Sequence, residues 1–175
     1  MLINLTELFS SNGKENTYTC DIDMEALHTK EEDYPVVSKL PVKLRIRNLG
    51  DRKLLVQGNA ELTLQIPCAR CLEPVDCPFK LELDEELDMS KTEADHVQEL
   101  DEQPYVSGYN LDVDRLLSNE LLLNLPIRVL CREDCKGICN RCGANLNHTK
   151  CSCDTSSPDP RMSAIQDIFQ KFKEV

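Results

Sequence analysis

The stretch that decides the fold covers residues 54–66 and reads LLVQGNAELTLQI. Its even-numbered residues, from Leu54 to Ile66, are apolar or small, and every odd-numbered residue after Leu55 is polar. Because side chains along a strand point alternately to opposite faces, this alternation predicts a long strand with one buried face.

The same alternation appears on both sides of this stretch, over residues 18–24, 42–46 and 75–83. Asn48–Asp51 supplies turn residues between the second of these runs and the stretch at 54–66, which predicts a hairpin there. Together these runs predict an antiparallel sheet of about four strands or more.

The residues that follow the last run change in character. Residues 84–109 are acidic and polar and predict a solvated loop. A helix is predicted over residues 112–123, with Asp112 as its N-cap, an apolar stripe on one face, and Pro126 beyond its end.

A second helix is predicted after Asp159, which would cap it, with Pro160 in the first turn and an apolar face beyond. The expected fold class is α+β: an antiparallel sheet with a helix, a Cys-rich zinc-binding segment and a C-terminal helix. The expected division is a β-rich domain over residues 1–125 and a Cys-rich domain over residues 126–175.

The formal net charge is −11 and the isoelectric point is about 4.7. Residues 84–102 hold nine carboxylates and one Lys, so they carry −8 of that −11. Phosphate binding depends on Lys and Arg, and the rest of the chain is only mildly acidic. The composition therefore excludes a uniformly basic nucleic-acid binder and still allows a local basic face.

The sequence contains ten Cys, no apparent secretory signal and no run of about 18 apolar residues, the minimum for a membrane span. We therefore expect a cytoplasmic protein, in which thiols stay reduced. Under those conditions, cysteines favour metal ligation or redox chemistry over structural disulfides.

Six of the cysteines lie between residues 131 and 153 in the pattern C-x3-C-x3-C-x2-C-x8-C-x-C. Pairs of Cys separated by two to four residues are typical ligands of tetrahedral zinc. The sequence predicts one structural Zn²⁺ ion, with Cys139 and Cys142 as its central ligands. The remaining ligands would come from Cys135, Cys151 and Cys153.

Three more cysteines are weaker candidates. Cys131 lies at the edge of the cluster, and Cys68 and Cys71 form a separate C-x-x-C pair. That pair has three interpretations: thiols that pack against the core, half of a metal site, or a redox dithiol. His148 is an alternative zinc ligand or a surface residue.

Basic residues mark two candidate RNA-binding surfaces. Lys43, Arg45 and Arg47 occupy the outward phase of one predicted strand, without the aromatic residues that stack bases. In the Cys-rich segment, Arg132 and Arg141 belong to a local excess of three positive charges, and a zinc ion with four thiolates would add −2 and leave +1.

No phosphate-binding glycine loop, serine hydrolase motif or zinc protease motif occurs, so we expect a protein that is not an enzyme and has no small-molecule substrate. An all-thiolate zinc site is structural because it leaves no open position. Two alternatives remain: a thiol-redox or zinc-sensing protein, and a protein–protein adaptor without RNA contact.

Several motifs resemble those of the YceD family, the large ribosomal RNA subunit accumulation proteins. In the second half of the chain they are Leu125-Pro126, CREDCKGIC at 131–139, CGANLN at 142–147, CSC at 151–153 and DPRM at 159–162. The earlier CARCLEP at 68–74 resembles the other signature of the family. Asn140 differs from the Pro that is common at its position.

This resemblance implies a role in the synthesis, processing or stability of large-subunit ribosomal RNA, in bacteria and in plastids. Family members are often encoded beside a ribosomal protein of the large subunit. The implied partners are therefore large-subunit ribosomal RNA or its precursor particles, through direct contact or through a ribosomal protein.

Overall fold

The computed structural model describes residues 1–30, 32–90 and 103–153, and the chain divides into two compact units. Unit 1 comprises Met1–Pro67 and Pro74–Val129, and unit 2 comprises Cys68–Glu73 and Leu130–Val175. The boundary between Val129 and Leu130 differs from the expected division after residue 125, which stays a prediction. The assignment of the short loop 68–73 to the Cys-rich unit has no counterpart in the sequence-based division.

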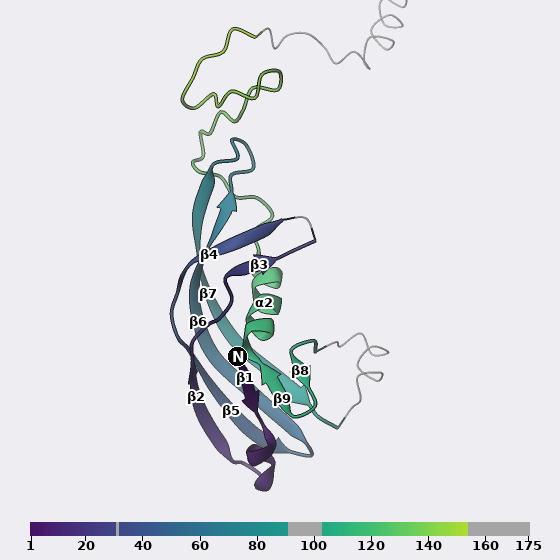
Figure 1. The fold of residues 1–175 in the computed structure, drawn as a ribbon. Helices are drawn as coiled ribbons and strands as arrows, with labels where there is room; N and C mark the ends of the chain where they lie inside the picture. Colours follow the sequence, from purple (N-terminus) through teal and green to yellow (C-terminus); the bar gives the residue numbers. More distant parts are fainter. Residues whose placement is uncertain (31, 91–102, 154–175) are drawn as a thin grey trace, which may run out of the picture. The chain divides into compact units, whose positions relative to one another are not determined.

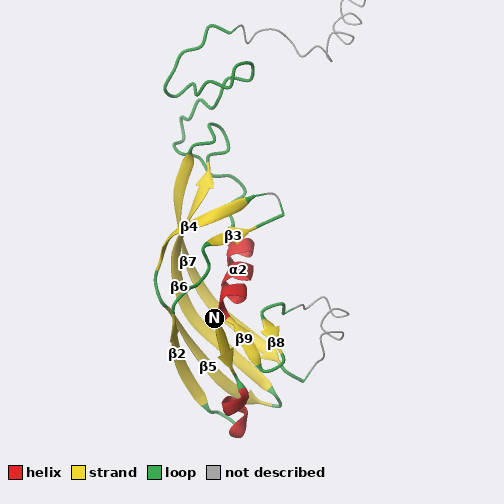
Figure 2. Ribbon diagram, in the orientation of Figure 1, coloured by secondary structure: helices red, strands yellow, loops and turns green. Residues whose placement is uncertain are grey.

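Unit 1 consists mainly of antiparallel strands (Figures 1 and 2). Its main sheet has six strands: β2 (Glu15–Cys20), β3 (Ala26–His28), β4 (Asp33–Lys39), β5 (Val42–Gly50), β6 (Lys53–Pro67) and β7 (Pro74–Asp88). β6 is the central strand. One of its edges pairs with β7 from Lys53 to Pro67, and the other pairs first with β5 and then with β4.

The predicted alternation over residues 54–66 is confirmed in β6. Leu54, Val56 and Leu64 are completely buried, whereas Gln57 and Asn59 are exposed. The predicted hairpin is also confirmed, because β5 and β6 pair antiparallel on either side of Asp51 and Arg52, and Gly50 at the end of β5 has a φ of +94°. The side-chain oxygen of Asn48 accepts a hydrogen bond from the Gly50 amide at 2.9 Å and holds this turn.

The predicted loop over residues 84–109 is wrong at both ends. β7 continues to Asp88, with Leu83 and Leu87 buried in the core between outward-facing carboxylates. At the other end, Val106–Ser107 forms strand β8. The density of acidic residues concealed the alternation of buried and exposed side chains. This alternation continues to the end of β7, since a strand can carry charged side chains on its outward face. Residues 91–102 lie outside the described residues.

The helix predicted over residues 112–123 is confirmed as α2 (Val113–Asn124). The Asp112 carboxylate accepts hydrogen bonds from the amides of Asp114 and Arg115, at 3.2 and 3.3 Å, and caps its first turn. Helix α2 lies against one face of the sheet (Figure 1), and Leu116, Leu117 and Leu121 enter the same core as β5, β6 and β7.

A small sheet completes unit 1, with β1 (Leu2–Asn4), β9 (Asn110–Asp112) and β8 in that order, together with a short 3-10 helix, η1 (Thr6–Ser10). The architecture agrees with the expected α+β class of antiparallel sheet and helix. The predicted C-terminal helix lies outside the described residues. Among the described helices, none has the length and apolar character needed to cross a lipid bilayer.

Candidate metal centres

Unit 2 contains little regular secondary structure, and its described part is built from turns around cysteines. The loop 68–73 closes through hydrogen bonds from the Cys68 amide to the Glu73 carbonyl, at 2.8 Å, and from the Leu72 amide to the Cys68 carbonyl, at 2.9 Å. Leu72 has a φ of +63°. This tight turn brings both cysteines of the C-x-x-C pair into one group of sulfur atoms.

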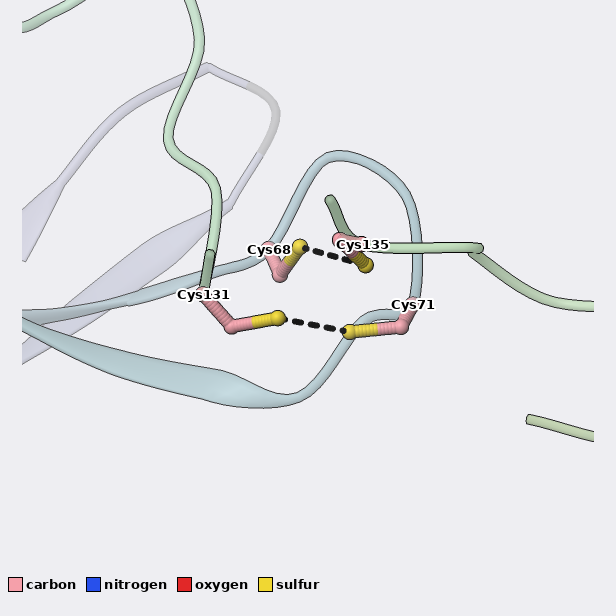
Figure 3. A group of neighbouring side chains, drawn as sticks. All are labelled: Cys68, Cys71, Cys131 and Cys135. Carbon is pink, nitrogen blue, oxygen red and sulfur yellow. Dashed lines mark hydrogen bonds between the residues drawn. The ribbon is translucent and has the colours of Figure 1, made fainter. Parts of the chain in front are cut away.

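The first group of cysteines comprises Cys68, Cys71, Cys131 and Cys135, with all sulfurs within 4.8 Å of one another. Two of the sulfur–sulfur distances are 3.6 Å, between Cys71 and Cys131, and 3.9 Å, between Cys68 and Cys135. Figure 3 shows the four sulfurs directed toward one another from the loop and from residues 131–135. A tetrahedron with Zn–S bonds of about 2.3 Å has edges of roughly 3.8 Å, so this spacing suits a zinc ion.

The second group comprises Cys139, Cys142, Cys151 and Cys153, again with all sulfurs within 4.8 Å of one another. A turn at 139–143 is closed by a hydrogen bond from the Gly143 amide to the Cys139 carbonyl, at 2.9 Å. Gly143 has a φ of +71°, as expected for a zinc knuckle. The Cys139 amide bonds to the Ala144 carbonyl at 2.8 Å and fixes the returning chain.

Backbone amides favour the thiolate form of the first cysteine in each C-x-x-C turn. Hydrogen bonding from the backbone amides of Cys71 and Arg70 lowers the pKa of the Cys68 thiol to about 6. The backbone amides of Cys142 and Arg141 likewise lower the pKa of Cys139 to about 6. The thiolate is the form that binds metal, so both turns are prepared for ligation near neutral pH.

Other thiols in these groups are harder to ionise. The Glu73 amide favours the Cys71 thiolate, but burial and the neighbouring Cys68, Cys131 and Cys135 sulfurs outweigh it and raise the pKa to about 12. The Cys142 sulfur and burial raise the pKa of Cys153 to about 12. Closely packed thiolates repel one another, and a divalent cation at their centre offsets this repulsion. Four sulfur ligands without an open position fit structural zinc.

The grouping of the cysteines differs from the expected single site. Cys139, Cys142, Cys151 and Cys153 lie together as expected, whereas Cys135 belongs to the other group. The weaker candidates Cys131, Cys68 and Cys71 complete that first group. The sequence contained part of the evidence for the first group, because Cys68 and Cys71, and likewise Cys131 and Cys135, have the spacing of zinc-ligand pairs. Only the tertiary structure brings the two pairs together.

Two further residues support the first group and were missed in the sequence. The Arg70 guanidinium donates to the carbonyl of Cys135 at 2.8 Å. The Asn147 side-chain amide lies 3.3 Å from the Cys135 sulfur, and it lowers the pKa of that thiol. His148 is not in either cysteine group, because its Nε2 faces the Glu73 carboxylate at 2.6 Å.

The candidate RNA-binding residues lie in both units. Lys43, Arg45 and Arg47 are exposed on the outward face of β5, and the Arg45 guanidinium lies 3.4 Å from the Glu15 carboxylate. In unit 2, Arg132 and Arg141 are exposed. Arg132 bonds to the Asn147 side-chain oxygen at 3.0 Å and lies 3.4 Å from the Asp134 carboxylate.

A groove of about 620 Å³ lies on the outward face of unit 1 beside the first two of these basic residues. Its lining combines polar and apolar surface and comprises Thr17, Leu40, Pro41, Lys43, Leu44, Arg45, Gln57, Gly58, Asn59 and Glu61. The groove offers cations, amides and a hydroxyl to a ligand, but no aromatic ring for stacking a base.

Comparison with known proteins points to the same family as the sequence motifs do. The chain is 31% identical to uncharacterised proteins of Mycobacterium bovis and Mycobacterium tuberculosis over 136 residues, which cover 78% of this chain and 61% of the relatives. It is 23% identical to the chloroplastic YCED homolog 1 of Arabidopsis thaliana, named a large ribosomal RNA subunit accumulation protein, with coverage of 82% and 52%.

The chain thus spans about half to three fifths of the length of these relatives. No solved structure matches it significantly. The family model described as large ribosomal RNA subunit accumulation protein YceD matches residues 56–169, a range that includes both cysteine groups. The chain therefore belongs to the YceD family of large ribosomal RNA subunit accumulation proteins.

Proposed function

We propose that this protein is a non-enzymatic factor of ribosome biogenesis. It supports the synthesis, processing or stability of large-subunit ribosomal RNA and acts in the cytoplasm on that RNA or its precursor particles. The observation that carries this proposal is the family match over residues 56–169. The name of the chloroplast relative describes the same role for that protein.

The chemistry of the cysteine groups supports a structural role for metal in this factor. Each group offers four thiolates, which would occupy all positions of a tetrahedral zinc ion and leave none for a substrate or a reactive water. Zinc would stabilise the turns of unit 2, where the described segments bury few apolar side chains besides the cysteines.

The half of the outward sheet face formed by β5 and β6 carries side chains that suit direct contact with RNA. On that face, β5 presents Lys43, Arg45 and Arg47, and the neighbouring β6 presents the amides Gln57 and Asn59. Cations bind phosphate oxygens, and amides bind sugar hydroxyls and base edges. The RNA backbone would therefore follow β5, with the groove beside Lys43 and Arg45 taking part of it.

The other half of the same face has the opposite charge. β7 presents Glu82, Asp84 and Glu86 outward, and these carboxylates repel phosphates. They suit a basic segment of a ribosomal protein, which would bring the factor to RNA indirectly. The acidic half would confine RNA to the β5 side of the face. The alternative is that a protein partner binds β7 and that RNA does not contact the sheet.

Two double variants with the same change in net charge test direct contact. Lys43→Glu/Arg45→Glu alters the basic half, and the control Lys30→Glu/Arg115→Glu alters an exposed lysine and an exposed arginine of unit 1 that do not line the groove. We expect the first variant to bind large-subunit ribosomal RNA at least about tenfold more weakly and with a lower salt dependence, since each lost phosphate contact lowers the salt slope by about one. The control should bind nearly as the native protein does.

Equal binding by all three proteins would reject direct contact through β5 and favour a protein partner. The broader role has its own test. Depletion of the protein in its host should lower large-subunit ribosomal RNA relative to small-subunit ribosomal RNA, and an unchanged ratio would contradict the proposed function.

A further inference from the structure

We propose that unit 2 binds two zinc ions in separate sites, one in each cysteine group, and that the more exposed second site releases its ion first. The first group then becomes a complete metal site built from Cys68, Cys71, Cys131 and Cys135. This inference does not rest on the proposed function, because metal content is measured without reference to RNA.

The two C-x-x-C turns have the same local geometry. Residues 68–72 read C-A-R-C-L, and residues 139–143 read C-N-R-C-G. In each, the amide of the fifth residue bonds to the carbonyl of the first Cys at 2.9 Å, and the fifth residue has a positive φ, +63° at Leu72 and +71° at Gly143. The first turn therefore has the form of a zinc knuckle as fully as the second.

The backbone conformation of Leu72 is a second, independent observation in favour of metal binding by the first turn. A left-handed conformation is strained for a residue with a Cβ, and glycine avoids this strain. Leu72 is 64% exposed, so burial of its side chain does not explain the strain. A turn that places two sulfurs around a cation does explain it, since local strain persists where the surrounding structure imposes it.

The sulfur positions favour two separate ions over one shared cluster. The eight sulfurs form two groups of four, and no sulfur belongs to both groups. A binuclear thiolate cluster needs sulfurs that bridge its metals, whereas four sulfurs at the corners of a tetrahedron satisfy one zinc ion completely. Each group therefore has the ligands for one ion and none to share.

The loop between Cys142 and Cys151 of the second site links the two sites, because two of its side chains contact residues of the first site or of the 68–73 loop. In this loop, Asn147 donates to the Cys135 sulfur at 3.3 Å and accepts from the Lys136 amide at 2.8 Å. His148 faces the Glu73 carboxylate at 2.6 Å. Such contacts orient metal ligands and contribute to affinity. Unit 2 thus forms one interlinked structure around two ions.

Exposure of the sulfur ligands differs between the sites. In the first site only Cys131 is exposed, and Cys68, Cys71 and Cys135 are buried. In the second site, only Cys139 is buried. Chelators and oxidants reach exposed thiolates more readily, so the second ion should leave first.

The test uses the full chain, purified with its thiols reduced. Elemental analysis should find two zinc ions per chain, and titration of the metal-free protein with Co²⁺ should end at two equivalents with tetrahedral tetrathiolate absorption. Cys71→Ser/Cys131→Ser and Cys142→Ser/Cys153→Ser should each retain one ion. Cys77→Ser, which changes a half-buried thiol outside both groups, should retain two.

One equivalent of Co²⁺ at the end point in the native protein would overturn the proposal, as would loss of both ions from both double variants. Release is measured with a chromogenic chelator, and the native protein should show a fast and a slow phase. The fast phase should be absent from Cys142→Ser/Cys153→Ser. If it persists there, the order of release is wrong.

Discussion

At the scale of single residues, Gly58 shows how closely two strands approach in the sheet. It lies on β6 opposite Leu44 of β5, and a Cβ at this position would lie 2.4 Å from the Lys43 carbonyl oxygen and 2.9 Å from the Leu44 side chain. The first of these contacts is with backbone, which cannot rotate away. Glycine is therefore required here for steric reasons, beside the groove of the outward face.

Gly58→Ala should lower the free energy of unfolding of unit 1 by about 1–3 kcal/mol, the usual range for overpacking. Urea denaturation followed by circular dichroism measures the change. The matched control is Asn59→Ala on the same strand, at an exposed position, which should change stability by less than about 0.5 kcal/mol. Equal effects of the two substitutions would show that the sheet relaxes around the added methyl group.

Glu120 on α2 gives a second prediction at the residue scale. Burial raises the pKa of its carboxyl, and the nearby Glu85 of β7 raises it further. An acid with a raised pKa in the folded state stabilises that state most at pH values below its unfolded pKa. The stabilisation is lost as the pH rises through the folded pKa.

Glu120→Gln should therefore stabilise unit 1 at pH 7–8 relative to the native protein, by less than about 1 kcal/mol because the carboxyl is partly exposed. The gain should disappear near pH 4, where the native carboxyl is protonated. Thermal unfolding of both proteins between pH 4 and pH 8 measures this difference. A gain that is independent of pH would point to packing instead of ionisation.

At the scale of elements, both the local sequence and the packing against the sheet specify where helix α2 begins. The Asp112 carboxylate caps the amides of the first turn, and the apolar stripe of the helix enters the core shared with β5, β6 and β7. The cap sets the first residue of the helix, and that residue determines which side chains face the sheet.

Asp112→Ala should destabilise unit 1 by about 1 kcal/mol, because two amides of the first turn lose their acceptor. Asp112→Asn keeps a side-chain oxygen that can accept the same hydrogen bonds and should retain most of the stability. Denaturant unfolding compares the three proteins. If the Asn variant lost as much as the Ala variant, the charge of Asp112 would matter more than its cap, through the neighbouring Arg115 and N-terminus.

At the scale of the whole molecule, the two units hold their structure by different means. Unit 1 buries an extensive apolar core, whereas the buried side chains of unit 2, within its described segments, are those of cysteines. A core of apolar side chains needs no cofactor, but turns around thiolates depend on the cation between them. Stability toward chelators should therefore differ between the units.

Removal of zinc with a strong chelator under reducing conditions should expose residues 130–153 to protease while unit 1 stays intact. Limited proteolysis with mass spectrometry locates the cleavage sites, and circular dichroism reports the strands of unit 1. Readdition of Zn²⁺ should restore protection. Protection of residues 130–153 that survives complete metal removal would contradict a metal-stabilised unit 2.

Two zinc ions also change the charge of the Cys-rich segments, residues 68–73 and 128–153, in which Arg70 and Glu73 cancel. Arg128, Arg132, Lys136, Arg141 and Lys150 exceed Glu133 and Asp134 by three positive charges. Two tetrathiolate zinc sites at −2 each add −4 and leave −1, in place of the +1 that one ion would leave. This balance makes the β5 face of unit 1 the stronger candidate for phosphate contact.

The sequence by itself determined the strands β5 and β6, the turn between them, most of β7, and helix α2 with its cap. Each of these depends on periodicity or on residues close together in the chain, so the pattern is complete within one segment. The end of β7 was missed because Asp84, Glu85 and Glu86 read as a charge cluster, although the alternation continues there and the Asp84 and Glu86 side chains share one outward face.

The tertiary structure alone decided which sulfurs share a metal. Spacing identified Cys139 and Cys142 as a pair, and nothing local assigns Cys135 to Cys68 and Cys71 instead. That assignment requires the 68–73 loop to meet residues 131–135, more than fifty residues later in the chain. Metal coordination depends on distances in space, and spacing along the chain constrains those distances only within a single turn.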